Sequence, residues 1–171
     1  MSDKKSLVVF FSRADENYNV GTVEVGNTEL LAKKIAEVTG ADEFKIVPVK
    51  AYPEKYMECV GLATAEKESG VRPEYMGDAT DFAQYNTIFL GYPIWWGDLP
   101  MIVYSFLEKH DFSGKTVRPF CTHEGSGSAG TFDLLANLLS GATVGEGLEM
   151  SGTKARSDAG LKCVEEWAKS S

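Results

Sequence analysis

Residues suited to an anion stand at the start of a predicted helix in the first part of the chain. Gly26-Asn27-Thr28 precedes apolar residues at helical spacing from Leu31 onward, and Ser12 follows an apolar run at residues 7–11. The first N–H groups of a helix have no partner within it, and the helix dipole favours negative charge there. Glycine lets the backbone approach a ligand closely. These residue types fit a phosphate, although a capped helix after a polar loop would show the same pattern.

Two adjacent tryptophans form the second unusual feature. Trp95 and Trp96 lie in a loop at residues 92–100, directly after a strand predicted at residues 86–91. Consecutive side chains point in different directions, so we expect at least one indole to face the crevice at the ends of the strands. Exposed aromatic surface usually has a partner, and a flat aromatic ligand would suit it. The alternative is that both rings cover the edge of the sheet.

A third loop is rich in glycine and follows another predicted strand. Residues 122–130 read Thr-His-Glu-Gly-Ser-Gly-Ser-Ala-Gly and match the pattern G-x-G-x-x-G. That pattern indicates dinucleotide binding when it occupies the first strand–helix turn, but this loop follows the fourth predicted strand. We interpret it as a thin backbone wall whose N–H and C=O groups contact a ring edge. At His123 and Glu124 we expect solvated side chains in preference to a catalytic pair. His110 lies on a polar segment, where a surface position is expected.

Strands and helices alternate along the chain and position these three loops. This alternation predicts an α/β protein with a parallel sheet and helices on both faces. In such a sheet, ligands bind outside the carboxyl ends of the strands, where loops 12–28, 92–99 and 122–130 are expected to lie. The predicted strands cover residues 7–11, 44–48, 86–91, 115–121 and 142–150, the last less regular because of two glycines. Five helices are predicted. The first ends near Gly40, the second runs from Pro53 to residue 70, and the third begins at Pro100. The last two cover residues 132–139 and 157–169. Residues 71–85 are expected to form a long connection.

Composition limits the classes of function. The 171 residues suit one domain, predicted to span residues 1–171, and a hydrophobic content of 43% is that of a globular protein. A net charge of −8 argues against nucleic acid and anionic membranes, and it fits a partner with a basic face. The three cysteines are scattered, without metal-ligand spacing, and no signal peptide is evident. A cytoplasmic protein without a metal site is therefore expected.

The three loops together resemble those of a known family. Phe11-Ser12, Gly26-Asn27-Thr28, Gly91-Tyr92-Pro93-Ile94-Trp95-Trp96-Gly97 and Thr122-His123-Glu124-Gly125-Ser126-Gly127 occur in this order after the expected strands. The chain resembles a flavodoxin, and more closely the flavodoxin-like proteins with a Gly-Tyr-Pro-x-Trp-Trp loop. The resemblance runs from Leu7 to about Met150. It implies a flavodoxin-like three-layer sandwich around a five-stranded parallel sheet of order 2-1-3-4-5.

The resemblance also implies non-covalent FMN and the residues that bind it. Ser12, Gly26, Asn27 and Thr28 match the phosphate loop of the family. The two loops that sandwich the isoalloxazine are matched by Pro93, Ile94, Trp95, Trp96 and Gly97 and by Thr122, His123, Glu124, Gly125 and Gly127. One departure is that residues 13–25 are interposed before the phosphate motif. Arg13, which opens this insertion, is expected to be solvated and not to bind the phosphate.

Three functions remain open at this point. The first is electron transfer through FMN to a redox partner protein with a basic face. The second is an NAD(P)H-dependent FMN reductase acting on a quinone or another small-molecule electron acceptor, since such an enzyme needs only a cavity over the ring. The third is a non-redox module that keeps the fold and binds a phosphate-bearing ligand or a protein.

Overall fold

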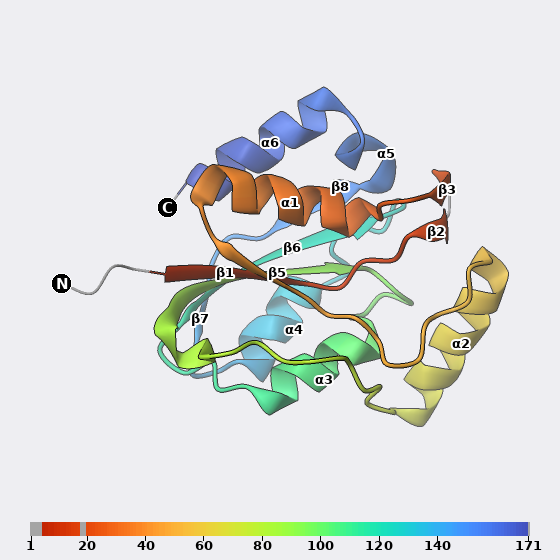
Figure 1. Cartoon of the computed structure of the whole chain (residues 1–171), viewed down its shortest axis with the longest axis horizontal. Helices are drawn as coiled ribbons and strands as arrows, with labels where there is room; N and C mark the ends of the chain where they lie inside the picture. The colour runs from red at the N-terminus through yellow and green to blue at the C-terminus, as the bar shows by residue number, and fades with distance from the viewer. Residues whose placement is uncertain (1–4, 18–19, 171) are drawn as a thin grey trace.

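A parallel sheet forms the centre of the computed structural model, which describes residues 5–17 and 20–170 (Figure 1). The sheet has the order β4-β1-β5-β6-β7, and β8 also pairs with β6. All these pairings are parallel, which confirms the predicted sheet and its order 2-1-3-4-5. The strands are β1 (Lys5–Phe10), β4 (Asp42–Lys45), β5 (Tyr85–Pro93), β6 (Thr116–His123), β7 (Thr143–Val144) and β8 (Leu148–Ser151).

Helices cover both faces of this sheet. Figure 1 shows α1 (Asn27–Thr39), α5 (Gly152–Ala155) and α6 (Asp158–Lys169) on one face, with α3 (Met101–Lys109) and α4 (Thr131–Leu138) on the other. Side chains alternate across β1, so Val8 and Phe10 pack with α1 and α6 while Val9 packs with α3. The continuous apolar runs predicted as strands are therefore buried on both faces, as parallel strands require.

Some element boundaries differ from the sequence prediction. The expected strand at 44–48 is β4 at Asp42–Lys45, and Pro48 instead forms an isolated bridge to Tyr75. The helix expected to open at Pro53 begins at Tyr56. The expected strand at 142–150 is split into β7 and β8 because the chain leaves the ladder around Gly145 and Gly147. Proline and glycine interrupt or shift ladders in this way because neither supports regular strand geometry well.

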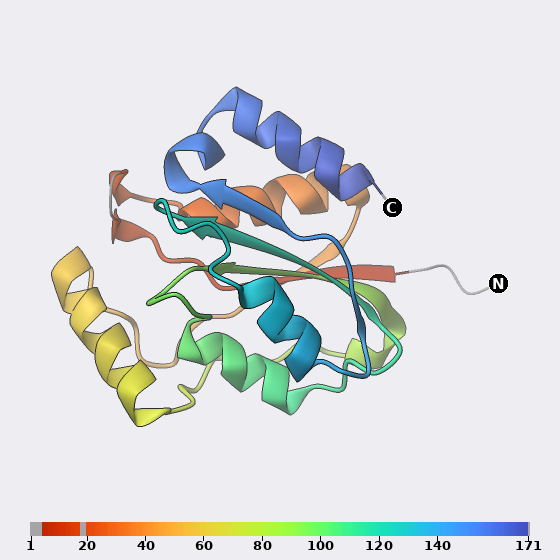
Figure 2. The same ribbon diagram turned by 180° about the vertical axis from the view of Figure 1, so that it is seen from behind.

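The inserted residues 13–25 carry a small hairpin at the carboxyl end of the sheet. Strands β2 (Asp15–Asn17) and β3 (Gly21–Val23) pair antiparallel. Helix α2 (Tyr56–Ser69) lies at the same end, beyond the ends of the strands and off both helical layers, as Figures 1 and 2 both show. Its only buried residues are Cys59 and Ala63. This helix therefore contributes little to the core and lies beside the loops that follow the strands.

The long connection at 71–85 is partly core, which the sequence did not predict. Tyr75 and Phe82 are buried, and Phe82 opens a short 3-10 helix, η1 (Phe82–Gln84). His110, expected at the surface, has a side chain that is only 7% exposed. Its ring stacks on Phe106 at 4.1 Å and its Nε2 lies 2.8 Å from a carboxylate oxygen of Asp78. In the part of the chain that the structure describes, no helix has the length and apolar character to span a membrane.

Candidate functional site

The amino-terminal end of α1 meets the end of β1 at very close range. Gly26 is buried before the first helical residue, and a Cβ there would lie within 3.0 Å of Ser12 Oγ and the Arg13 carbonyl oxygen. Ser12 Oγ accepts a hydrogen bond from the Glu29 N–H at 3.0 Å, so it caps the helix from another segment. The buried Thr28 and Thr122 hydroxyls bond each other at 2.8 Å. The first and third predicted loops are therefore joined at this end.

Asn27, the first residue of α1, is held by Arg156, which directly follows α5. Arg156 Nε donates to Asn27 Oδ1 at 2.9 Å, and another guanidinium nitrogen donates to the Val25 carbonyl. Gly152 allows this approach, because a Cβ there would lie within 3.0 Å of Asn27 Nδ2 and Glu124 Oε1. Arg156 was not predicted as a site residue.

The tryptophan loop is a tight turn. Trp95 and Asp98 exchange backbone hydrogen bonds of 3.0 and 3.1 Å, and Trp96 and Gly97 have φ values of +54° and +67°. Two consecutive left-handed residues define a type I′ turn, in which glycine is well suited to the second position. The Trp95 ring packs edge-on against Phe11, with centroids 5.3 Å apart. Trp96 is 57% exposed, so one indole packs against the core and the other points outward.

The glycine-rich loop has one feature that differs from the prediction. His123 Nδ1 accepts a hydrogen bond from the Gly125 N–H at 3.0 Å, which fixes the ring at the start of the loop. Glu124 was expected to be solvated, but its Oε1 is buried. Gly125 and Gly127 have φ values of +106° and +63°, which side chains rarely adopt. The backbone of this loop therefore requires glycine at two positions, and the Glu124 side chain turns inward.

Helix α2 forms a further wall and is attached mainly by polar contacts. At its start, Glu16 Oε1 accepts from the Tyr56 N–H at 2.9 Å. Near its end, Lys67 Nζ donates to the Trp96 carbonyl at 2.8 Å and lies 3.5 Å from a carboxylate oxygen of Asp98. Glu66 Oε1 accepts from the Tyr52 hydroxyl at 2.7 Å. Hydrogen bonds and an ion pair thus link α2 to the hairpin and the tryptophan turn.

Arg13 lines the cavity and is bound to backbone carbonyls, which corrects the expectation that it is solvated. Its guanidinium donates to the carbonyls of Glu16, Pro53 and Glu54, the last two at 2.8 and 2.7 Å. It ties the hairpin to the segment that leads into α2. Burial raises the pKa of the neighbouring Cys59 thiol, and the Arg13 charge opposes that shift. The thiol is therefore a protonated, weakly nucleophilic group at neutral pH.

A single cavity of about 260 Å³ connects these segments. Of the predicted site residues it is lined by Ser12, Asn27, Thr28, Pro93, Ile94, Trp95, Trp96, Thr122, His123 and Glu124. Gly26, Gly97, Gly125 and Gly127 lie in the same three loops without lining it. Lining residues that were not predicted are Arg13, Asn17, Tyr56, Cys59, Val60 and Ala63. The spacing of the last four on α2 predicted one helix face, but it did not indicate what that face covers.

Comparison with known proteins identifies the family. The model of the family described as Flavodoxin matches residues 17–168. The chain belongs to the flavodoxin family. No curated protein matches it.

Solved structures agree with this assignment. This flavodoxin-family chain is 28% identical to a candidate flavoprotein from Bacteroides uniformis, covering 98% of this chain and 99% of that one at a TM-score of 0.77. A candidate flavoprotein from Bacteroides eggerthii is 27% identical, with 96% of each chain covered and a TM-score of 0.77. A Lactobacillus acidophilus flavoprotein solved in complex with FMN has 18% identity, coverage of 86% and 93%, and a TM-score of 0.67, which supports the fold alone.

Proposed function

We propose that the protein binds FMN non-covalently in the cavity described above and transfers electrons through it. One observation carries the proposal: three loops, separated by tens of residues in the sequence, enclose one cavity with a helix amino terminus at one end and adjacent tryptophans at the other. The relative solved with FMN has the same fold. FMN supplies the redox chemistry when bound, and the protein supplies binding, orientation and electrostatics.

The residues present fit the phosphate of FMN. The close packing around Gly26 brings backbone N–H groups at the start of α1 to the cavity, next to the Ser12 and Thr28 hydroxyls and the Asn27 amide. Hydrogen bonds from such donors to a charged group contribute about 1.5–3 kcal/mol each. A helix amino terminus adds a favourable dipole. The phosphate is therefore the only charged group of the ligand that the part of the cavity at the start of α1 needs to bind.

The opposite part of the cavity fits a flat, largely apolar ring. Ile94 and Trp95 come from the turn after β5, while Val60 and Ala63 come from α2. The cavity volume of about 260 Å³ is near the lower limit of roughly 300 Å³ for ligand pockets. A cavity of this size suits one flavin ring and leaves little room for a second molecule inside it.

For the partner, we propose a protein with a basic face. Glu16, Glu54 and Glu58 are exposed on the hairpin and around the start of α2, next to the cavity. Met57 is 71% exposed on the same helix, and Trp96 is 57% exposed. Exposed acidic and apolar side chains beside the cavity suit transient docking of a basic redox partner.

A small-molecule reductase is the second candidate, and α2 is the observation that favours it. Its residues Cys59 and Ala63 are buried in the cavity wall, so the helix shields the site from a large partner on that side. A quinone-sized acceptor would not be excluded in this way. Arg13 and Asn17, from the insertion at residues 13–25, also line the cavity and narrow it on this side.

Two measurements test the proposal. Purified protein should be yellow or become yellow with FMN, and denaturation should release FMN in a ratio of one per chain. Colourless protein that does not bind added FMN would contradict the proposal and leave a non-redox module. Steady-state oxidation of NAD(P)H, with and without a quinone, then separates the two roles. A carrier should show no turnover without a reductase, whereas the second candidate should turn over alone.

A further inference from the structure

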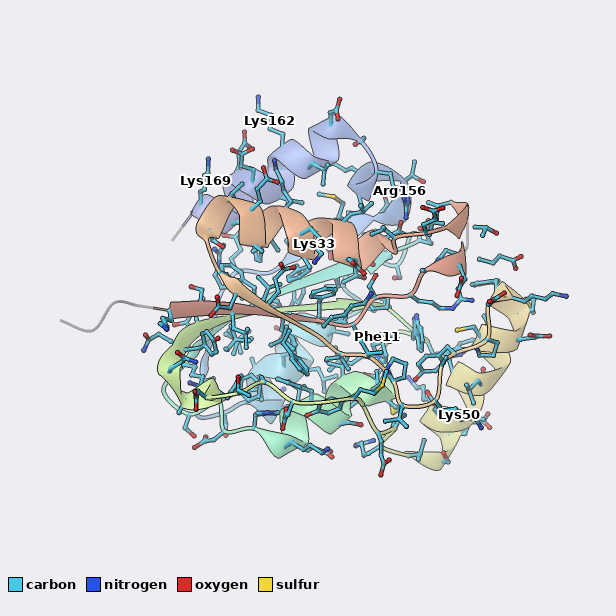
Figure 3. The ribbon with its side chains drawn as sticks, viewed as in Figure 1. Phe11, Lys33, Lys50, Arg156, Lys162 and Lys169 are labelled. Carbon is cyan, nitrogen blue, oxygen red and sulfur yellow. The ribbon has the colours of Figure 1, made fainter. Side chains whose placement is uncertain are left out.

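Arg156 lies where the phosphate end of the cavity meets the last part of the chain. Figure 3 shows it between α5 and the amino-terminal end of α1. Its Nε donates to Asn27 Oδ1 at 2.9 Å, and a second nitrogen donates to the Val25 carbonyl. These two acceptors flank Gly26, the glycine that allows α1 to start against Ser12. One guanidinium therefore fastens both sides of the turn that opens α1.

This contact determines which way the Asn27 amide faces. A guanidinium only donates hydrogen bonds, so the atom that meets Arg156 is the amide oxygen. The Nδ2 group, with its two N–H donors, then faces away from Arg156, on the side of Gly152 and the Glu124 carboxyl. Asn27 also lines the cavity. Without Arg156, nothing in this contact would prevent the amide from rotating and presenting its oxygen to an anion instead.

The charges around Asn27 give Arg156 a second effect. Glu124 Oε1 and Asn27 Nδ2 both lie within 3.0 Å of the point where a Cβ of Gly152 would be. A carboxylate so close to a phosphate site opposes a dianionic ligand. Arg156 is the cation that contacts the same asparagine, so it offsets this repulsion. The neutral donors of the site, Ser12 and Thr28, cannot do so.

We propose that Arg156 is a positioning residue that makes the site selective for a phosphorylated flavin over an uncharged one. This inference rests on the proposed function, and it assigns the selectivity to a residue outside the three loops. Arg156 orients Asn27 as a donor and lowers the electrostatic cost of placing a phosphate near Glu124. Neither effect involves the isoalloxazine ring, so the affinity for a flavin without a phosphate should not depend on Arg156.

The experiment compares FMN with riboflavin, which has the same ring and no phosphate. Apoprotein is titrated into each flavin, and the dissociation constant is obtained from the quenching of flavin fluorescence. We expect Arg156→Met to raise the dissociation constant for FMN about tenfold and to leave that for riboflavin nearly unchanged. Arg156→Lys should lie between the two, because an ammonium keeps the charge but cannot bridge both acceptors in the fork geometry of arginine.

Two controls separate this role from a general effect of charge or folding. Lys154→Met removes an exposed cation from the short helix α5, two residues before Arg156, and should change neither dissociation constant appreciably. The salt dependence of FMN binding is an independent readout. Its slope should be shallower in Arg156→Met, because one cation near the phosphate is lost. Near-ultraviolet circular dichroism of each variant checks that the apoprotein is folded.

The possible outcomes distinguish the inference from the function on which it rests. Wild-type protein that binds neither flavin would contradict the proposed function and the inference together. Wild-type protein that binds FMN, with an equal loss for both flavins in Arg156→Met, would overturn only the inference and show a structural role. An unchanged FMN dissociation constant and salt slope would also overturn it.

Discussion

At the scale of single residues, close approach of the backbone explains the strongest part of the site. Gly26 allows α1 to begin against Ser12 and Arg13, with no space for a methyl group. The sequence identified this glycine and its neighbours because together they match the phosphate loop of the flavodoxins. It could not identify Arg156, which is 129 positions from its partner Asn27 and follows no pattern.

Substitution of Gly26 tests this close approach. We expect Gly26→Ala to lower the free energy of unfolding by about 1–3 kcal/mol through overpacking. It should also raise the dissociation constant for FMN, because α1 must move away from Ser12. Urea denaturation of the apoprotein and flavin titration measure the two effects.

Gly61→Ala is the matched control for that substitution. Gly61 is exposed on α2 and a Cβ there has no neighbour within 4 Å. Alanine should therefore stabilise the helix by about 1 kcal/mol, as in an exposed helix interior. Equal behaviour of the two variants would show that Gly26 is not sterically constrained.

At the scale of elements, α2 is the least expected feature. Its buried residues are few, and Lys67 connects it to the tryptophan turn through the Trp96 carbonyl and Asp98. Sequence patterns predicted the helix because Tyr56, Val60 and Ala63 share one face. They could not place it beyond the end of the sheet, because an amphipathic face does not specify its partner.

Removal of the Lys67 contact tests how α2 is attached. Lys67→Met should change the free energy of unfolding by less than about 1 kcal/mol, since the pair is partly exposed. Amide hydrogen exchange should nevertheless accelerate in α2 and at residues 95–98, because local opening becomes easier.

A second lysine variant serves as the reference for Lys67. Lys33 pairs with Glu43 at 3.0 Å on the outer side of α1, away from the cavity. Lys33→Met should leave exchange in α2 and the turn unchanged. Equal exchange in both variants would contradict the role of Lys67.

At the scale of the whole molecule, the buried strands followed from the sequence pattern, whereas their order followed from the resemblance to the flavodoxins. Leu7-Val8-Val9-Phe10-Phe11 and Ile88-Phe89-Leu90 are apolar on successive positions, which only strands buried on both faces need. The hairpin at residues 15–23 could not be predicted in this way. Its strands are only three residues long and exposed or partly exposed, without a continuous apolar run, and Arg13 ties this segment to distant carbonyls. The local sequence pattern therefore predicted the buried strands. The position of the hairpin depends on polar contacts between residues that are distant in the sequence, which such a pattern does not show.

Buried tyrosines predict how the whole molecule responds to alkaline pH. Burial and a hydrogen bond to Asp42 raise the pKa of Tyr85 to about 12. Burial also raises the pKa of Tyr52, Tyr75, Tyr92 and Tyr104. Above about pH 10, the unfolded chain loses these protons while the folded chain keeps them. The folded state then binds more protons, so the free energy of unfolding falls as pH rises.

The expected result is nearly constant stability around neutral pH, a small loss above about pH 8 because burial also raises the pKa of the Cys59 and Cys121 thiols, and a larger loss between about pH 10 and 12. Urea denaturation at several pH values measures the stability, and tyrosinate absorbance follows ionisation. Most of the tyrosinate signal should appear together with unfolding. Full ionisation near pH 10 in protein that remains folded would contradict the burial of these phenols.

The central claim is that the three loops form one FMN site, and amide chemical shifts of ¹⁵N-labelled apoprotein during an FMN titration test it most directly. The account predicts saturation at one equivalent, with the largest shifts at Asn27, Thr28, Gly97 and Gly125 and at the indole N–H groups of Trp95 and Trp96. Riboflavin should reproduce the shifts of the ring loops but not those of Asn27 and Thr28. No saturable shifts, or shifts confined to one loop or to the opposite end of the sheet, would contradict the account.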